Sequence, residues 1–266
     1  MTAITHLVVN GCSWTYGQGL ENPASQAWPA LVAKELGIPV VNLAVRGSGN
    51  DGIHRRTYEY IYDNLSTNSS PLVIVAWSQL WRREGWYEEY DGHKLQDYKV
   101  IQHPTGKYPD HNSNPNYIDL YQPLIIPHWN EEDFLRKTLI YKLSLQNLFN
   151  SLSIPYLMAD YSHDMLSDEY LKLTKTSKCK SFYESAYNKF HIDSLPGKIK
   201  QFNPLPCLHD GPEAQQVLAD YILSEIKKLH PNISIRKDST YLSIDNFVIE
   251  KNKQTNDWKV AAKNKK

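Results

Sequence analysis

The stretch "HLVVNGCSWTYGQG", residues 6–19, decides the fold. Its apolar run ends at Asn10, and small residues follow, with glycines at positions 11 and 17. An apolar run that stops at a glycine is typical of a buried strand turning into the next element. Ser13 falls inside that turn. This serine either caps the following helix or presents its hydroxyl at the carboxyl edge of a sheet.

The alternation of strand and helix continues along the chain. Further apolar runs predict strands over residues 38–45, 71–78 and 154–160. Helical spacing predicts helices over residues 27–37, 50–66, 130–152 and 211–229. Strands that alternate with helices predict an α/β fold, here a three-layer α/β/α sandwich with a mostly parallel, doubly wound sheet. The third strand is nearly all apolar, as expected of a strand that is buried on both faces.

Two segments lie outside this alternation. Residues 82–128 are rich in tyrosine, proline and glycine, and we interpret them as an aromatic loop insertion. Residues 236–266 end in a polar, basic run, which predicts a C-terminal arm and a disordered tail, with residues 239–250 either a small hairpin or an extended arm. Residues 1–235 then form one α/β domain that carries the insertion.

Composition and charge argue against several classes of protein. The 266 residues include 29 acidic and 29 basic side chains, so the net charge is zero. The protein therefore has no overall positive potential that would favour binding to nucleic acid. No apolar run reaches the roughly 18 residues of a membrane span, and the N-terminus lacks the basic region of a signal peptide. We expect a soluble protein, either cytoplasmic or part of an assembly that is released without a signal peptide. Its oligomeric state stays open.

Metal and cofactor sites are not predicted. The three cysteines have the spacing of neither a zinc ribbon nor a disulfide framework: Cys12, Cys179 and Cys207. Four residues of the insertion lack tight metal-ligand spacing: His103, Asp110, His111 and His128. The glycine-rich run "GSGNDG", residues 47–52, lacks both the dinucleotide-binding spacing and a Walker lysine.

Polar residues follow the expected strands at the edge where sites in α/β sheets gather. Ser13 follows the first strand and can act as a nucleophile if a base reaches its hydroxyl. His209 precedes the last helix, and its ring can lean across the same edge. The backbone N–H groups of Ser13 and Gly47, with a polar side chain after the third strand, could stabilise an oxyanion. These residues together predict a hydrolytic site.

Four blocks resemble the SGNH/GDSL hydrolase family, in the family's order. "GCSWTYG" resembles the family's Gly-Asp-Ser-x-x-x-Gly opening, and "NLAVRGSGND" is similar to its second block. "VIVAWSQ" occupies the place of the third block, and "CLHDGPEAQQVLADYI" resembles the last. The resemblance implies an SGNH-hydrolase, flavodoxin-like fold with Ser13 as nucleophile and His209 as base. It also implies oxyanion donors at Ser13 and Gly47, and ester hydrolysis through an acyl-enzyme without a metal.

The chain departs from the family pattern at three positions. Cys12 stands where the family has aspartate, and Ser78 stands where the third block has asparagine. Ser78 or the adjacent Gln79 would then be the third oxyanion donor. Pro206 replaces the acid that usually precedes the histidine by three residues. The groups left to orient the imidazole are a backbone carbonyl, Asp160, Asp164 and Asp210; without one of them the site is a Ser–His dyad.

The expected substrate follows from the aromatic insertion. Trp86 and Tyr87 lie within it and could stack on sugar rings, and Trp77, near the end of the third strand, is a further candidate substrate contact. Arginines near the strand ends could bind an anionic group on the substrate: Arg46, Arg82 and Arg83. We expect a serine esterase that acts on an O-acyl ester, with O-acetyl groups on a carbohydrate as the first candidate.

Other interpretations stay open. The missing acid at position 206 favours a catalytically weak or inactive module that binds carbohydrate or has a structural role. Acyl transfer differs from hydrolysis only in the acceptor, which the sequence does not reveal. Cys12 is an alternative nucleophile because a cysteine before a helix can have a lowered pKa, although we expect its side chain to point away from Ser13.

Overall fold

The structure is a computed structural model. It describes residues 3–64, 69–80, 82–87, 96–101, 131–161, 185–192, 195–199, 201–207, 209–235, 247–251 and 258–262. At its centre is a four-stranded parallel sheet in the order β2-β1-β3-β6. Its strands are β1 (His6–Asn10), β2 (Val40–Asn42), β3 (Pro71–Trp77) and β6 (Tyr156–Asp160).

The strand order places a switch point between β1 and β3. The chain steps from β1 outward to β2 and then crosses back to β3 on the other side of β1. In the register, Asn10 lies opposite Val75, and Trp77 lies opposite Asp160. The four strands of this sheet are parallel, so their carboxyl ends share one edge of the sheet. Sites in open α/β sheets form at such an edge, next to the switch point.

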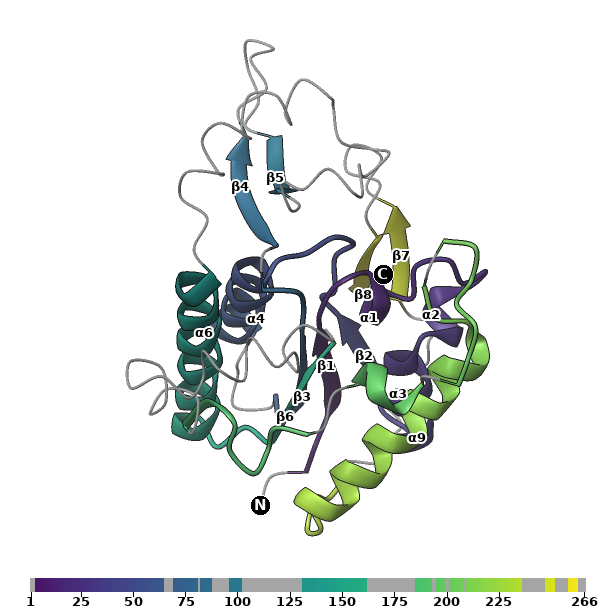
Figure 1. The fold of residues 1–266 in the computed structure, drawn as a ribbon. Coiled ribbons are helices and arrows are strands. Elements are labelled where there is room, and N and C mark those ends of the chain that lie inside the picture. Colours follow the sequence, from purple (N-terminus) through teal and green to yellow (C-terminus); the bar gives the residue numbers. More distant parts are fainter. Residues whose placement is uncertain are drawn as a thin grey trace.

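Helices cover both faces of the sheet (Figure 1). One face carries α3 (Trp28–Leu36) and α9 (Pro212–Leu229). The opposite face carries α4 (Asn50–Asn64) and α6 (Glu131–Ser151). The fold is therefore the three-layer α/β/α sandwich that the sequence predicts.

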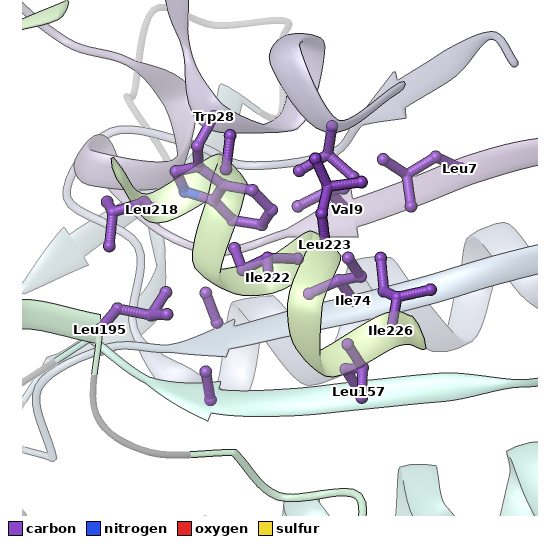
Figure 2. Packing of buried hydrophobic residues seen from close by; sticks show 14 of the residues in the cluster. Leu7, Val9, Trp28, Ile74, Leu157, Leu195, Leu218, Ile222, Leu223 and Ile226 are labelled. Atoms are coloured by element: carbon purple, nitrogen blue, oxygen red, sulfur yellow. The ribbon is translucent and has the colours of Figure 1, made fainter. Parts of the chain in front are cut away.

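The core divides according to the alternation of side chains along each strand. Leu7 and Val9 pack toward α3 and α9, whereas Val8 packs toward α4 and α6. Figure 2 shows α9 laying Ile222 and Ile226 over the strands on the first of these faces. All seven residues of β3 are buried, as predicted for a strand that is covered on both sides.

Two segments differ from the sequence-based expectation. The insertion contains β4 (Arg83–Tyr87) and β5 (Gln96–Ile101), which pair antiparallel, so it is not a loop throughout. The expected disordered tail likewise contains β8 (Trp258–Ala262), which pairs with β7 (Phe247–Lys251). β4 and β5 contain charged residues and lack a regular alternation of apolar and polar positions, so the sequence pattern does not predict them. The domain boundary at residue 235 stays a prediction.

The second strand is shorter than predicted. The regular strand spans only Val40–Asn42. Leu43 and Val45 still donate to the carbonyls of Val9 and Gly11, and residues 45–48 then form a turn. No helix within the described part of the chain is both long and apolar enough to span a bilayer.

Candidate active site

Ser13 is the first residue of α1 (Ser13–Tyr16), directly beyond the end of β1. The N-cap position belongs to Cys12, so the capping role considered for Ser13 is wrong. A Cβ atom at Gly11 would lie 2.3 Å from Thr15 Oγ1 and 3.1 Å from the carbonyl oxygen of Ala76. Only glycine therefore allows this turn. As the first helical residue, Ser13 has an N–H without an acceptor inside the helix.

A buried asparagine fixes the turn that precedes Ser13. Asn10 Oδ1 accepts from the N–H of Gly11 at 2.8 Å. Its Nδ2 donates to the carbonyl of Ile53 and to Thr57 Oγ1 on α4, both at 2.9 Å. Since an unsatisfied buried amide is costly, these bonds lock the end of β1 against α4.

His209 has the tautomer that a general base needs. Its Nδ1 lies 2.7 Å from the carbonyl oxygen of Cys207, and because a carbonyl only accepts, Nδ1 carries the proton. Nε2 is left with a lone pair. The ring centroid lies 5.8 Å from that of Trp14, the residue after Ser13. Burial lowers the pKa of His209, the Cys207 bond opposes this, and the charge of Arg82 lowers it further.

The loop that carries His209 is tied to the end of β6. The Tyr161 hydroxyl donates to the carboxylate of Asp210, and the Tyr161 ring stacks on Trp14 at 5.2 Å between centroids. Burial, and then the charge of Asp210, hold the pKa of Tyr161 well above its ordinary value, so its hydroxyl stays a donor. Asp210 therefore pairs with Tyr161 and positions the loop; it does not orient the His209 ring.

The same loop packs against the turn that follows α1. A Cβ atom at Gly19 would lie 2.4 Å from Cys207 Sγ, and the φ of Gly19 is 90°. Leu205 also donates its N–H to the carbonyl of His209 at 2.7 Å. These contacts bring two segments nearly two hundred positions apart to one edge of the sheet. Among the described residues, however, no hydrogen bond joins Ser13 Oγ to the His209 ring.

Gly47 lies in a turn that is bonded to the one before Ser13. Ser48 donates its N–H to the carbonyl of Val45 at 3.2 Å, and Gly47 has a φ of 75°, as the third residue of a type II turn requires. Val45 in turn donates to the carbonyl of Gly11 at 3.3 Å. Within the described part of the chain, the N–H of Gly47 has no acceptor, so it is available to an oxyanion.

The residues after β3 differ from the expectation. Ser78 is fully buried, and its N–H donates to Asn50 Oδ1 at 2.8 Å while its carbonyl accepts from Asn50 Nδ2 at 3.1 Å. Ser78 Oγ accepts from the guanidinium of Arg82 at 3.3 Å. The carbonyl of Gln79 accepts the N–H of Arg82 at 3.3 Å. Ser78 and Gln79 thus hold Arg82, and their oxyanion role stays a prediction.

Asp160 is wrong as the orienting acid. Its Oδ1 accepts from Lys142 Nζ at 2.7 Å, and its Oδ2 accepts from the Tyr187 hydroxyl at 2.8 Å and lies 3.4 Å from His191 Nε2. We call these four residues the Lys142 cluster. Burial alone would raise the pKa of Asp160, but the charges and hydrogen bonds of Lys142 and His191 together lower it. Both oxygens of Asp160 are therefore bound to groups other than His209, whose Nδ1 donates to the carbonyl of Cys207.

Other predicted residues are placed as follows. Trp77 is wrong as a substrate contact, because it is fully buried in the core against α4 and α6. Arg46 is exposed, with its guanidinium carbon 5.5 Å from the centroid of the Tyr16 ring. Asp164 lies outside the described residues, as do the side chains of Trp86 and Tyr87 on β4. The described residues contain no group of three or more potential metal ligands.

Sequence reasoning missed residues that build the site. Tyr161 directly follows β6 and Trp14 comes four residues after the end of β1, so a search near strand ends for aromatic side chains would have found both. Asn50 begins α4, where it looks like an ordinary cap. The role of the Cys207 carbonyl as the partner of His209 could not be predicted from the sequence, because every residue has a backbone carbonyl.

Comparisons with known proteins agree with this fold. Residues 16–180 match the model of a family described as "Family of unknown function (DUF6071)". The psychrotrophic esterase EstA from Pseudoalteromonas sp. is 13% identical, with 86% of this chain and 100% of that chain covered and a TM-score of 0.50. TesA is 14% identical, with 85% and 99% covered and a TM-score of 0.51.

A looser likeness is to a member of the lipolytic protein G-D-S-L family from Veillonella parvula DSM 2008. It is 10% identical, with 86% of this chain and 100% of that chain covered and a TM-score of 0.43. No curated protein matches the sequence. At these identities the likeness to EstA and TesA shows the fold, and the chemistry has to be argued from the site.

Proposed function

The chain belongs to DUF6071, a family of unknown function, and we propose that it is a serine ester hydrolase of the SGNH type. Ser13 is the nucleophile, and His209 is the general base. The observation that carries the proposal is the 2.7 Å bond from His209 Nδ1 to the carbonyl of Cys207. That bond leaves Nε2 unprotonated, on a ring in contact with the residue next to Ser13.

The reaction proceeds in two halves. His209 Nε2 takes the proton of the Ser13 hydroxyl as Oγ bonds to the acyl carbon. The N–H groups of Ser13 and Gly47 stabilise the negative oxygen that forms. His209 then returns its proton to the leaving alcohol, and an acyl-enzyme remains. In the second half His209 takes a proton from water, the resulting hydroxide attacks the acyl carbon, and Ser13 leaves with the proton.

The Cys207 carbonyl takes the place of the usual acid. It fixes the orientation and tautomer of the imidazole as a carboxylate does, but it carries no full charge. The imidazolium that forms during the reaction is therefore less stabilised than beside a carboxylate. We expect slow turnover compared with an enzyme that has a complete triad.

The substrate is an O-acyl ester, with O-acetyl groups on a carbohydrate as the first class. The support for this class is compositional, because residues 82–128 are polar-aromatic rather than aliphatic. Trp86 and Tyr87 lie on β4, which contacts α4 next to the site edge of the sheet.

A chromogenic acetyl ester tests the proposal. Ser13→Ala should lower kcat/KM by at least about a hundredfold, because it removes the atom that forms the acyl-enzyme. Ser25→Ala is the matched control: this serine is exposed on α2 (Pro23–Gln26) and bonds only to the nearby carbonyl of Asn22. Equal turnover by the Ser13→Ala variant and the wild type would overturn the assignment.

A second candidate is a binding module on the same fold. The lack of a hydrogen bond between Ser13 Oγ and the His209 ring within the described residues favours it. Catalytic hydrogen bonds are often long in unliganded sites and tighten when substrate binds, which is why we prefer the enzyme. Binding of an acetylated oligosaccharide without any turnover would select the binding module.

A further inference from the structure

Among the described residues, Arg82 is a positive charge at the site without a negative partner. It is half-buried just beyond β3, and within the described part of the chain no carboxylate lies within ion-pair distance of its guanidinium. One of its nitrogens donates to the neutral oxygen of Ser78 at 3.3 Å. A guanidinium has five N–H donors, and among the described residues this is the side-chain bond that they make, so most of them have no acceptor there.

The position of Arg82 is fixed relative to Ser13 and His209. Its guanidinium carbon lies 5.6 Å from the centroid of the Trp14 ring, which also contacts the His209 ring at 5.8 Å. A Cβ atom at Gly49 would lie 2.5 Å from the carbonyl oxygen of Arg82. The backbone of Arg82 therefore packs directly against the loop that presents Gly47. Arg82 therefore lies near enough to His209 for its charge to affect that ring, and it contacts neighbours of Ser13 and Gly47.

The environment of Arg82 is energetically unfavourable unless an anion binds to its guanidinium. A half-buried cation without a counter-ion loses part of its hydration, and its charge lowers the pKa of His209, which weakens the base. The acids nearby are engaged elsewhere: Asp51 Oδ1 accepts from the N–H of Gly52 at 2.9 Å, and Asp210 accepts from Tyr161. By contrast, Arg55 on α4 has its own carboxylate, Glu59, at 2.8 Å.

We propose that Arg82 binds an anionic group of the substrate, so that the preferred substrates are esters carrying a carboxylate or a phosphate near the scissile bond. This inference rests on the proposed ester hydrolysis and names the substrate class for the same site. A guanidinium suits both anions, because its paired N–H groups match two oxygens at once. Arg46, next to Gly47, adds a second positive charge on the same side of the sheet.

Matched chromogenic esters test the inference. One is the 4-nitrophenyl ester of adipic acid with a free terminal carboxylate, and its neutral counterpart has that carboxylate capped as a methyl ester. A third ester ends in a phosphate monoester. The quantity measured is the ratio of kcat/KM for each anionic ester to that for the neutral one, at about pH 8, where an imidazole is neutral.

The wild type should prefer at least one anionic ester, and Arg82→Gln should lower that ratio about ten- to hundredfold. Arg82→Lys keeps the charge but loses the paired donors, so its ratio should be intermediate. Lys228→Gln is the control for charge alone, because Lys228 lies at the far end of α9, about 24 Å from Pro212 along the helix axis. Whichever anionic ester shows the larger ratio identifies the group that is bound.

An unchanged ratio in Arg82→Gln, with both esters still hydrolysed, would overturn the inference and leave the proposed function standing. If the wild type hydrolyses none of the esters, the proposed function fails, and binding decides the role of Arg82. Calorimetric titration of monomethyl adipate into Ser13→Ala, with and without Arg82→Gln, should then show about ten- to hundredfold weaker binding in the double variant. Equal affinity, with unchanged circular dichroism, would contradict the inference.

Discussion

At the scale of single residues, the site depends on which residue occupies the N-cap position of α1. Cys12 takes the N-cap of α1 and makes no side-chain cap bond, so the Ser13 hydroxyl is not consumed in capping. Gly11 permits the turn, and Gly17, with a φ of 84°, ends the helix one turn later by donating to the carbonyl of Ser13 at 3.1 Å. The serine is thus held by its backbone, and within the described part of the chain its hydroxyl makes no hydrogen bond.

The pH dependence of turnover follows from the environment of His209. Burial and Arg82 lower its pKa below the ordinary 6.5, and catalysis needs the neutral ring. We therefore expect kcat/KM for a neutral ester to rise with pH and to reach half its plateau below pH 6.5. Arg82→Gln should move this midpoint upward, because it removes a charge that disfavours the imidazolium.

Lys228→Gln again serves as the control and should leave the midpoint in place. A pH–rate profile of kcat/KM for all three proteins makes the comparison, since it reports the ionisation of the free enzyme. A midpoint above 6.5, or one that Arg82→Gln leaves unmoved, would place His209 outside the reaction or away from Arg82.

At the scale of elements, the Lys142 cluster joins α6 to β6. Lys142 is fully buried, and Asp160 supplies its counter-charge at 2.7 Å. Asp160→Asn would leave a buried ammonium uncompensated and should lower the free energy of unfolding by about 3–5 kcal/mol at neutral pH. Asp220→Asn is the matched control on the exposed face of α9, where its side chain bonds only to Gln216.

The cluster also predicts how acid affects stability. Because the folded-state pKa of Asp160 lies below its unfolded value, its contribution is fully present above about pH 4 and declines as the pH falls further toward the folded value. Denaturant unfolding of the wild type and Asp160→Asn across acidic pH measures this. The gap between the two proteins should narrow in acid, whereas a gap that does not depend on pH would contradict an ionised Asp160.

At the scale of the whole molecule, equal numbers of acidic and basic residues conceal a local excess of positive charge. The 29 acidic and 29 basic side chains cancel over the chain, yet Arg82 lies over the Trp14 ring near His209, and Arg46, next to Gly47, lies over the Tyr16 ring. The zero net charge argues against a nucleic-acid partner. It says nothing about the charge of a small substrate, which responds to the local field.

The layers could be predicted from the sequence because the spacing of apolar residues indicates which positions are buried. The continuous apolar run of β3, for example, indicates a strand that is covered on both faces. The rule that sites lie at strand ends also led to Ser13 and Gly47 as candidates, and their roles in catalysis stay predictions. The rule failed for Asp160, because the counter-charge comes from Lys142, whose approach depends on how α6 packs on β6. It failed for Trp77 because the last residue of a strand can point either to the edge or into the core.

The central claim is that Ser13 is an activated nucleophile, and intact-mass measurement after treatment with a fluorophosphonate tests it most directly. We predict one adduct per chain, mapped to Ser13, absent in Ser13→Ala, slowed at least about a hundredfold in His209→Ala, and retained in Cys12→Ala. A folded protein that takes up no adduct, or that carries it on another residue, would contradict the account.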